Sequence, residues 1–178
     1  NRILEIGTYN GQFTLILSRL FPESEIVTID LPENDPIFRN TYDRTNDINY
    51  SNFVKERDYN LSKSDNIKFI QNNSFFLPNL FDNCFDLVWI DGGHNFPEIA
   101  WDLCNSFFLV KKGGYILCDD IICRNWNFTK GFTSNHSYST LNYISERIES
   151  NIHYFLKRRD PLKYPRKSTR KYVAMFQK

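Results

Sequence analysis

The chain has 178 residues and a formal net charge of +1, with 41% hydrophobic and 24% charged residues. These proportions are those of a globular protein, and they exclude a disordered, collagen-like or coiled-coil chain. The apolar runs fall far short of the roughly 20 residues that a membrane span needs. We expect one compact domain over residues 1–178, trimmed at the N-terminus because the sequence opens on an apolar stretch without an initiator Met.

Charge is unevenly distributed along the chain. Residues 152–178 carry nine Lys and Arg but one acidic residue, a net +8, which leaves −7 on residues 1–151. Aromatic residues interleave with these basic ones, so the segment is compatible with nucleic-acid binding, although a solvated basic loop is the favoured interpretation. The cysteines lack C-x-x-C spacing and are expected to be reduced, which indicates a cytoplasmic location: Cys84, Cys104, Cys118 and Cys123.

Short β-prone runs alternate with helical patterns along the chain. Strands are predicted at residues 3–6, 25–29, 67–70, 85–90 and 115–118, and helices at 12–21, 97–110 and 139–150. Such alternation predicts a parallel sheet. Two further strands, 152–156 and 171–176, are joined by a link too short for a helical crossover and should pair antiparallel.

One connection, residues 31–66, is longer than usual between two strands of an α/β unit. It is polar but contains scattered aromatic residues, and we predict one helix and a loop within it. Two interpretations stay open: a lid or substrate-binding element, or a surface insertion.

A glycine-containing loop follows the first predicted strand directly. It reads Glu5-Ile6-Gly7-Thr8-Tyr9-Asn10-Gly11, where Gly7 allows a tight turn close to a ligand and Gly11 allows close helix packing. A dinucleotide-binding loop would need glycine where Tyr9 stands, and a phosphate-binding P-loop would need lysine where Gln12 stands. The pattern therefore predicts a ligand loop for which nucleotide phosphates are not the obvious ligand.

An acidic residue, Asp30, ends the second predicted strand and is placed to accept both hydroxyls of a ribose. With the pattern of residues 5–11, and with segments 27–30, 85–94 and 109–115 in the same order, the chain resembles the class I S-adenosylmethionine-dependent methyltransferases. The resemblance implies a Rossmann-like α/β fold: a seven-stranded, mostly parallel sheet of order 3-2-1-4-5-7-6, with an antiparallel last strand and helices on both faces.

The same resemblance implies the residues that hold the cofactor. The methionine part would lie at the glycine loop, the ribose at Asp30, and the adenine at Asn73 and Ser74. Family members often carry Gly-Asp where this chain has Asn72-Asn73, so the adenine contact would be neutral. The predicted cofactor-binding residues are Glu5, Gly7, Thr8, Gly11, Asp30, Asn73, Ser74 and Asp91.

Three aspartates end two predicted strands: Asp91 ends the fourth, and Asp119 and Asp120 end the fifth. Neighbouring parallel strands lie about 4.8 Å apart, so these carboxylates can converge, and oxygen ligands in this number suit Mg²⁺ or Ca²⁺. The arrangement also resembles the metal-dependent O-methyltransferases of the catechol and macrolide-sugar type. We predict an Mg²⁺ site. The alternative is that Asp119 and Asp120 cap a turn while Asp91 faces solvent.

His94 follows Asp91 by three residues, the position at which catechol-type enzymes carry a basic residue beside the substrate hydroxyl. The acidic base of the macrolide-sugar type is missing, because Gly93 occupies its position. His94 is therefore the candidate general base, with Asp91 as the second catalytic residue. The alternative is a turn residue that bonds to the backbone.

These expectations combine into one function: Mg²⁺-dependent transfer of a methyl group from S-adenosylmethionine to a hydroxyl of a small-molecule acceptor. The alternatives are a methyltransferase acting on RNA or protein, and a non-catalytic cofactor-binding domain. No membrane partner is expected, and a homo-oligomer is compatible with the sequence.

Overall fold

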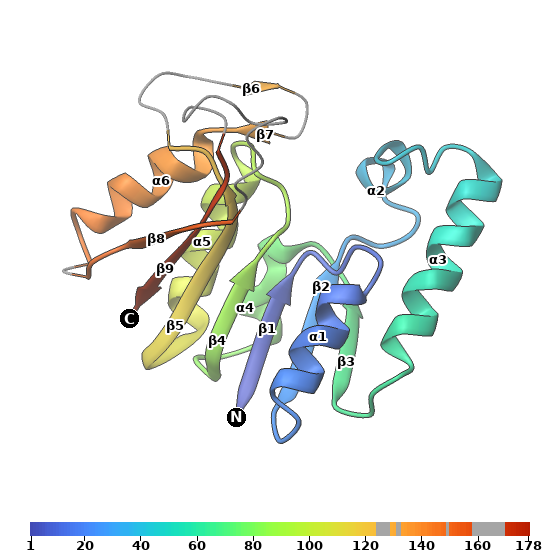
Figure 1. The fold of residues 1–178 in the computed structure, drawn as a ribbon, viewed down its shortest axis with the longest axis horizontal. Helices are drawn as coiled ribbons and strands as arrows, with labels where there is room; N and C mark the ends of the chain where they lie inside the picture. Colours follow the sequence, from blue (N-terminus) through green and yellow to red (C-terminus); the bar gives the residue numbers. More distant parts are fainter. Residues whose placement is uncertain (124–128, 131–132, 149, 158–169) are drawn as a thin grey trace.

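The computed structural model describes residues 1–123, 129–130, 133–148, 150–157 and 170–178 (Figure 1). Seven strands form one sheet in the order β3-β2-β1-β4-β5-β9-β8. The first five run parallel, and β9 is antiparallel to both of its neighbours. The strands are β1 (Arg2–Ile6), β2 (Glu25–Asp30), β3 (Ile67–Gln71), β4 (Phe85–Ile90), β5 (Val110–Ile121), β8 (His153–Leu156) and β9 (Tyr172–Gln177).

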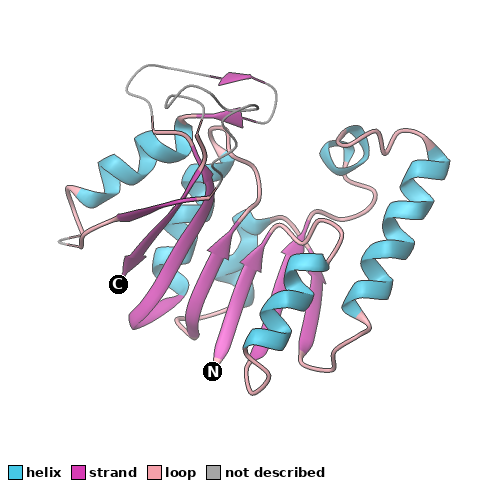
Figure 2. Ribbon diagram, in the orientation of Figure 1, coloured by secondary structure: helices cyan, strands magenta, loops and turns pink. Residues whose placement is uncertain are grey.

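Numbered along the chain, these seven strands have the order 3-2-1-4-5-7-6, so the predicted Rossmann-like sheet and its antiparallel last strand are confirmed. The core strands are buried on both faces, as in β1 and β2, because helices cover the sheet from both sides. Figure 2 shows the central sheet between its helices, with α1 (Gln12–Leu20) in front and α4 (Leu77–Leu80) and α5 (Glu98–Leu109) behind in the orientation of Figure 1.

Helix α5 illustrates how the sequence pattern produces this packing. Its buried residues follow helical spacing, so that one face of the helix meets the sheet: Ile99, Asp102, Leu103, Ser106 and Leu109. The buried apolar members of this face join one large cluster with β4, β5 and β9. The single polar carboxylate on this face, Asp102, lies next to the candidate site described below.

Three sequence predictions about these elements were wrong in detail. Residues 31–66 hold two helices, α2 (Pro36–Asn40) and α3 (Asp47–Leu61), each begun by a capping side chain from Asp35 or Asn46. Helix α6 (His136–Ser145) begins before residue 139, where its start was predicted, and the hydroxyl of Ser139 donates to the carbonyl of Asn135. Strand β5 begins at Val110, which pairs with Phe85 of β4, and Gly113 N donates to the carbonyl of Lys178, just after β9, at 2.7 Å.

The remaining elements are short. They are the 3₁₀ turn η1 (Ser74–Phe76) and the two-stranded hairpin of β6 (Thr129–Lys130) and β7 (Thr133–Ser134). Each helix in the described part of the chain falls short, in length or in apolar character, of what a membrane span requires.

Candidate active site

The glycine loop joins β1 to α1 at the carboxyl end of the sheet. Gly7 has φ of 98° and donates its N–H to the carbonyl of Ile29 at 2.9 Å. A Cβ on Gly7 would lie 2.3 Å from the carbonyl oxygen of Asp91. Gly11, with φ of 74°, is the N-cap of α1. Both glycines are therefore required by the backbone, and the loop is held between the ends of β2 and β4.

Asp30 closes the loop from the end of β2. Its carboxylate accepts hydrogen bonds from the backbone N–H of Tyr9 at 2.9 Å and of Leu31 at 2.8 Å. Burial raises the pKa of Asp30, while these two bonds act in the opposite direction. Each carboxylate oxygen keeps a second lone pair that could accept a ribose hydroxyl, and the ribose contact of Asp30 stays a prediction.

Glu5 lies beneath the loop and is only 1% exposed. Its Oε2 accepts hydrogen bonds from Thr28, at 2.6 Å, and from Thr14, whereas its Oε1 has no partner among the described residues. Burial raises the pKa of Glu5 to about 8, opposed by the two threonine bonds and reinforced by the nearby charges of Asp91 and Asp30. The other side chain of this network is Thr8, whose hydroxyl lies 2.6 Å from that of Thr28.

This raised pKa predicts a stability difference between the wild-type protein and Glu5→Gln. Between pH 4.5 and about 8, the folded protein keeps a proton on Glu5 that the unfolded chain has already lost. The contribution of protonated Glu5 to the free energy of unfolding is therefore present at low pH and is lost as pH rises through this range. The variant cannot ionise, so its stability relative to wild type should rise by roughly 1 kcal/mol per pH unit across this window. Denaturant unfolding of the cofactor-free proteins at pH 5 to 9 measures it.

Glu33→Gln is the matched control of opposite sign. The hydrogen bond from Arg57 lowers the pKa of Glu33, so this carboxylate stabilises the fold above its ordinary pKa and loses that contribution as pH falls. Glu33→Gln should therefore be less stable than wild type at neutral pH, with the gap closing in acid. A Glu5→Gln difference that does not change with pH would show that Glu5 is ionised in the folded protein.

The predicted adenine edge is built from the turn after β3. The side chain of Asn73 caps η1 by accepting from Phe75 N at 2.9 Å, and the carbonyl of Ser74 accepts from Asn105 at 3.1 Å. Asp102, which the sequence patterns did not single out, lies between this turn and the turn after β4: it accepts a hydrogen bond from Ser74, and a Cβ on Gly92 would be 3.1 Å from its Oδ2. A polar residue on the buried face of an apolar helix was the signal available in the sequence.

Asp102 is 1% exposed, and burial raises its pKa to about 7, while a hydrogen bond from Ser74 and the proximity of His94 act in the opposite direction. Its Oδ1 has no partner in the described part of the chain. Asp102 thus places a second carboxylate oxygen without a hydrogen-bond partner among the described residues beside the turn that carries Asp91 and His94.

Part of the connection 31–66 borders the glycine loop. The side chain of Asn60 in α3 donates to the carbonyl of Asn10 at 2.9 Å. The ring of Tyr9 makes edge contacts with Tyr42 at 5.0 Å and Phe53 at 5.3 Å between centroids. These contacts connect the segment to the candidate site, and no pattern in the sequence indicated them specifically.

His94 lies above the end of β4. Its Nε2 is 3.5 Å from Asp91 Oδ1, its side chain is 11% exposed, and its Nδ1 has no partner among the described residues. The backbone carbonyl of His94 accepts a hydrogen bond from Ser134 at 2.5 Å, which fixes the turn to β7. Asp91 and His94 are therefore brought together as predicted, and the catalytic role of the pair stays a prediction.

The predicted metal site is not supported. The register of β4 and β5 brings Asp91 next to Asp119, but Lys157 pairs with Asp119 and with Asp120, at 3.0 Å for the latter, and Lys171 pairs with Asp120. Among the described residues, no group of three His, Cys, Asp or Glu side chains is arranged to hold a metal ion. The residues present therefore do not fit Mg²⁺. Strand spacing alone could not reveal that β8 and β9 return two lysines to this place.

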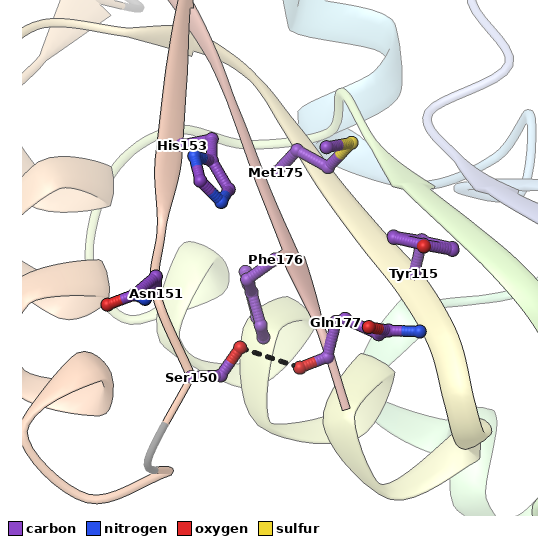
Figure 3. A pocket seen from close by; sticks show the side chains of 7 residues that line it. All are labelled: Tyr115, Ser150, Asn151, His153, Met175, Phe176 and Gln177. Carbon is purple, nitrogen blue, oxygen red and sulfur yellow. Dashed lines mark hydrogen bonds between the residues drawn. The ribbon is translucent and has the colours of Figure 1, made fainter.

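The residues of the candidate site fit S-adenosylmethionine better than they fit Mg²⁺. Asp30 retains free lone pairs at the position predicted for the ribose, and the buried Oε1 of Glu5 has no partner among the described residues. A separate cavity of about 390 Å³ lies at the other end of β5, between β5, β9 and β8 (Figure 3). Tyr115, His153 and Met175 line it together with Gln177, whose carbonyl accepts from Ser150 at 2.8 Å. Because it lies at the amino end of β5, this cavity is distinct from the candidate site.

Comparison with known proteins gives one family match and many similar structures. Residues 4–121 match the model of a family described as methyltransferase domain. Cofactor-bound Rv0187 from MTB is 20% identical, with a TM-score of 0.64, over 99% of this chain and 72% of that one. The O-methyltransferase TomG of Streptomyces achromogenes, solved with SAM and involved in tomaymycin synthesis, is 17% identical with the same TM-score and coverage.

An rRNA methylase from Streptococcus thermophilus is also similar, with 12% identity and a TM-score of 0.64 over 100% of this chain and 86% of that one. No curated protein matches the sequence significantly. At these identities the structural similarity shows the fold alone.

Proposed function

The chain belongs to the methyltransferase domain family matched over residues 4–121 and is a class I S-adenosylmethionine-dependent methyltransferase, and on this premise we propose that it methylates a hydroxyl oxygen of a small acceptor. The observation that carries the proposal is the His94–Asp91 pair, 3.5 Å apart at the end of β4. A base held beside a carboxylate suits an acceptor that must lose a proton during transfer.

S-adenosylmethionine supplies an activated methyl group, so the protein needs to orient the acceptor and receive its proton. In the proposed reaction the sulfur–methyl bond breaks, a new oxygen–methyl bond forms, and the hydroxyl proton passes to His94. Asp91 stabilises the positive charge that then develops on the imidazole. Alignment of the acceptor with the methyl group supplies a large part of the rate enhancement, roughly 7 to 11 kcal/mol in well-oriented systems.

Mg²⁺ dependence does not form part of this proposal, because lysines pair with two of the three predicted ligands. The solved O-methyltransferase with a similar fold, TomG, supports oxygen as the acceptor atom, whereas the similar rRNA methylase keeps RNA as an alternative. Of the basic segment, Lys157 and Lys171 are held in ion pairs and are therefore less available to RNA, whereas residues 158–169 lie outside the described residues.

The test is methyl transfer from labelled S-adenosylmethionine to separate panels of polyhydroxy small molecules, RNA and protein. We expect label in the small molecules. Label only in RNA or protein would replace the proposal with that alternative. Calorimetric binding of S-adenosylhomocysteine without turnover on any panel would support a non-catalytic cofactor-binding domain instead.

Asp30→Ala is expected to weaken cofactor binding in the same calorimetric measurement. It removes two charge-assisted hydrogen bonds to the ribose, each worth about 1.5 to 3 kcal/mol before water compensates. Asp30→Asn retains one carbonyl acceptor at this position and should lose less. Unchanged affinity in Asp30→Ala would place the ribose elsewhere.

A further inference from the structure

Every carboxylate oxygen at the acidic end of β5 accepts a hydrogen bond from the protein. Asp119 Oδ1 accepts from the N–H of Asp120 at 2.7 Å, and Asp119 Oδ2 accepts from Lys157. The two oxygens of Asp120 accept from Lys157, at 3.0 Å, and from Lys171. Each of the four carboxylate oxygens therefore already has an N–H donor from this chain.

Burial makes these contacts important. The side chain of Asp119 is 4% exposed and that of Asp120 is 20% exposed, so neither carboxylate is well hydrated. A buried carboxylate without a positive partner is strongly unfavourable. The lysine side chains, at 30% for Lys157 and 22% for Lys171, are themselves mostly covered.

The backbone holds the lysines at this place. Lys157 follows β8 and Lys171 precedes β9, and Lys157 N donates to Lys171 O at 3.0 Å. On the other side, the β5–β9 register shifts between Cys118 and Ile121, and Asp120 has a left-handed φ of 56°. This distortion turns the Asp120 carboxylate toward the lysines, and left-handed geometry in a residue other than glycine occurs where the surroundings enforce it.

The charges match those of a divalent cation. Two ammonium groups supply the same +2 that Mg²⁺ would supply to Asp91, Asp119 and Asp120. An ammonium group has three N–H donors, and two of those on Lys157 serve Asp119 and Asp120, so the third can serve an acceptor oxygen.

We propose that Lys157 and Lys171 replace a divalent cation in this methyltransferase, and that Lys157 donates its third N–H to the hydroxyl oxygen of the acceptor. The replacement of a cation by the two lysines is independent of the proposed function. The contact between Lys157 and the acceptor rests on the proposed function. Lys157 would then touch the reacting oxygen and act as a catalytic residue that lowers the free energy of the developing oxygen anion.

The first test measures cation binding directly, by electron paramagnetic resonance of Mn²⁺ titrated into the protein. Wild type should show no saturable site below millimolar Mn²⁺. Lys157→Met with Lys171→Met uncovers the aspartates and should bind Mn²⁺ at least tenfold more tightly. Lys111→Met, which breaks the ion pair with Asp86 at the other end of β5, is the matched control and should behave as wild type.

The wild-type titration keeps the inference testable even if the double variant fails to fold. Saturable micromolar Mn²⁺ binding by wild type would overturn it, because the lysines would then yield to a metal. A folded double variant that gains no affinity would also overturn it, because the aspartates would not form a cation site when uncovered.

The second test uses methyl transfer. Wild-type activity should stay within twofold in excess EDTA, and Lys157→Met should lower kcat at least tenfold with cofactor affinity unchanged, whereas Lys157→Arg should recover part of the loss. Loss of wild-type activity in EDTA that Mg²⁺ restores would overturn the inference. Absence of wild-type transfer to any small acceptor would instead contradict the proposed function and the contact between Lys157 and the acceptor. The Mn²⁺ titration would then decide by itself whether the lysines replace a cation.

Discussion

Replacing Gly7 with alanine is expected to abolish cofactor binding and to lower the free energy of unfolding by about 2 to 5 kcal/mol. The new Cβ would lie 2.3 Å from the carbonyl oxygen of Asp91 and 2.9 Å from the N of Gly92, and both are backbone atoms that cannot rotate away. The φ of 98° adds a conformational cost. The end of β4 or the glycine loop must move, and either movement displaces the site. Denaturant unfolding and calorimetry with S-adenosylhomocysteine measure the two effects.

Gly113→Ala separates the steric cost of the new Cβ from the conformational cost of a positive φ. Gly113 also has a positive φ, 83°, but among the described residues no atom beyond its chain neighbours lies within 4 Å of the position its Cβ would take. This variant should lose only the conformational term, about 1 to 2 kcal/mol, and bind the cofactor normally. Equal losses in the two variants, with cofactor binding intact in Gly7→Ala, would show that the contact between the loop and β4 relaxes freely.

His94→Ala is expected to lower kcat by about 10² to 10⁴, the range typical for loss of a general base, with little change in cofactor affinity. The expectation follows from the proposed function, in which Nε2 of His94, 3.5 Å from Asp91, receives the acceptor proton. Steady-state kinetics on the best small acceptor gives kcat and KM separately, and a denaturation curve checks that the 11% exposed side chain was not essential for folding.

His153→Ala is the matched control for His94→Ala. His153 lines the separate cavity at the other end of the sheet, so its removal should leave kcat unchanged (Figure 3). If His94→Ala is folded and retains near-wild-type kcat, His94 is a turn residue and the proton leaves to water.

Much of the fold could be predicted because the decisive signals are local. The predicted strand 85–90 coincides with β4, and the glycines at 7 and 11 occupy left-handed positions that few other residues adopt. The antiparallel pairing of β8 and β9 followed from a link too short for a crossover. The two helices within 31–66 were harder, because α3 buries only Arg57 and Asn60 and so lacks an apolar stripe.

The sequence by itself determined the glycine loop and the placing of Asp30 and Asp91 at strand ends, since each depends on neighbours in the chain. Alternation of elements predicted a parallel sheet, and its strand order was implied by the family resemblance. Only the tertiary structure decided the charge of the acidic end of β5. Lys157 lies 37 residues from Asp120, and Lys171 lies 51, so their ion pairs arise from the return of β8 and β9 beside β5. A carboxylate's function depends on the nearest opposite charge, and long-range pairing sets that distance.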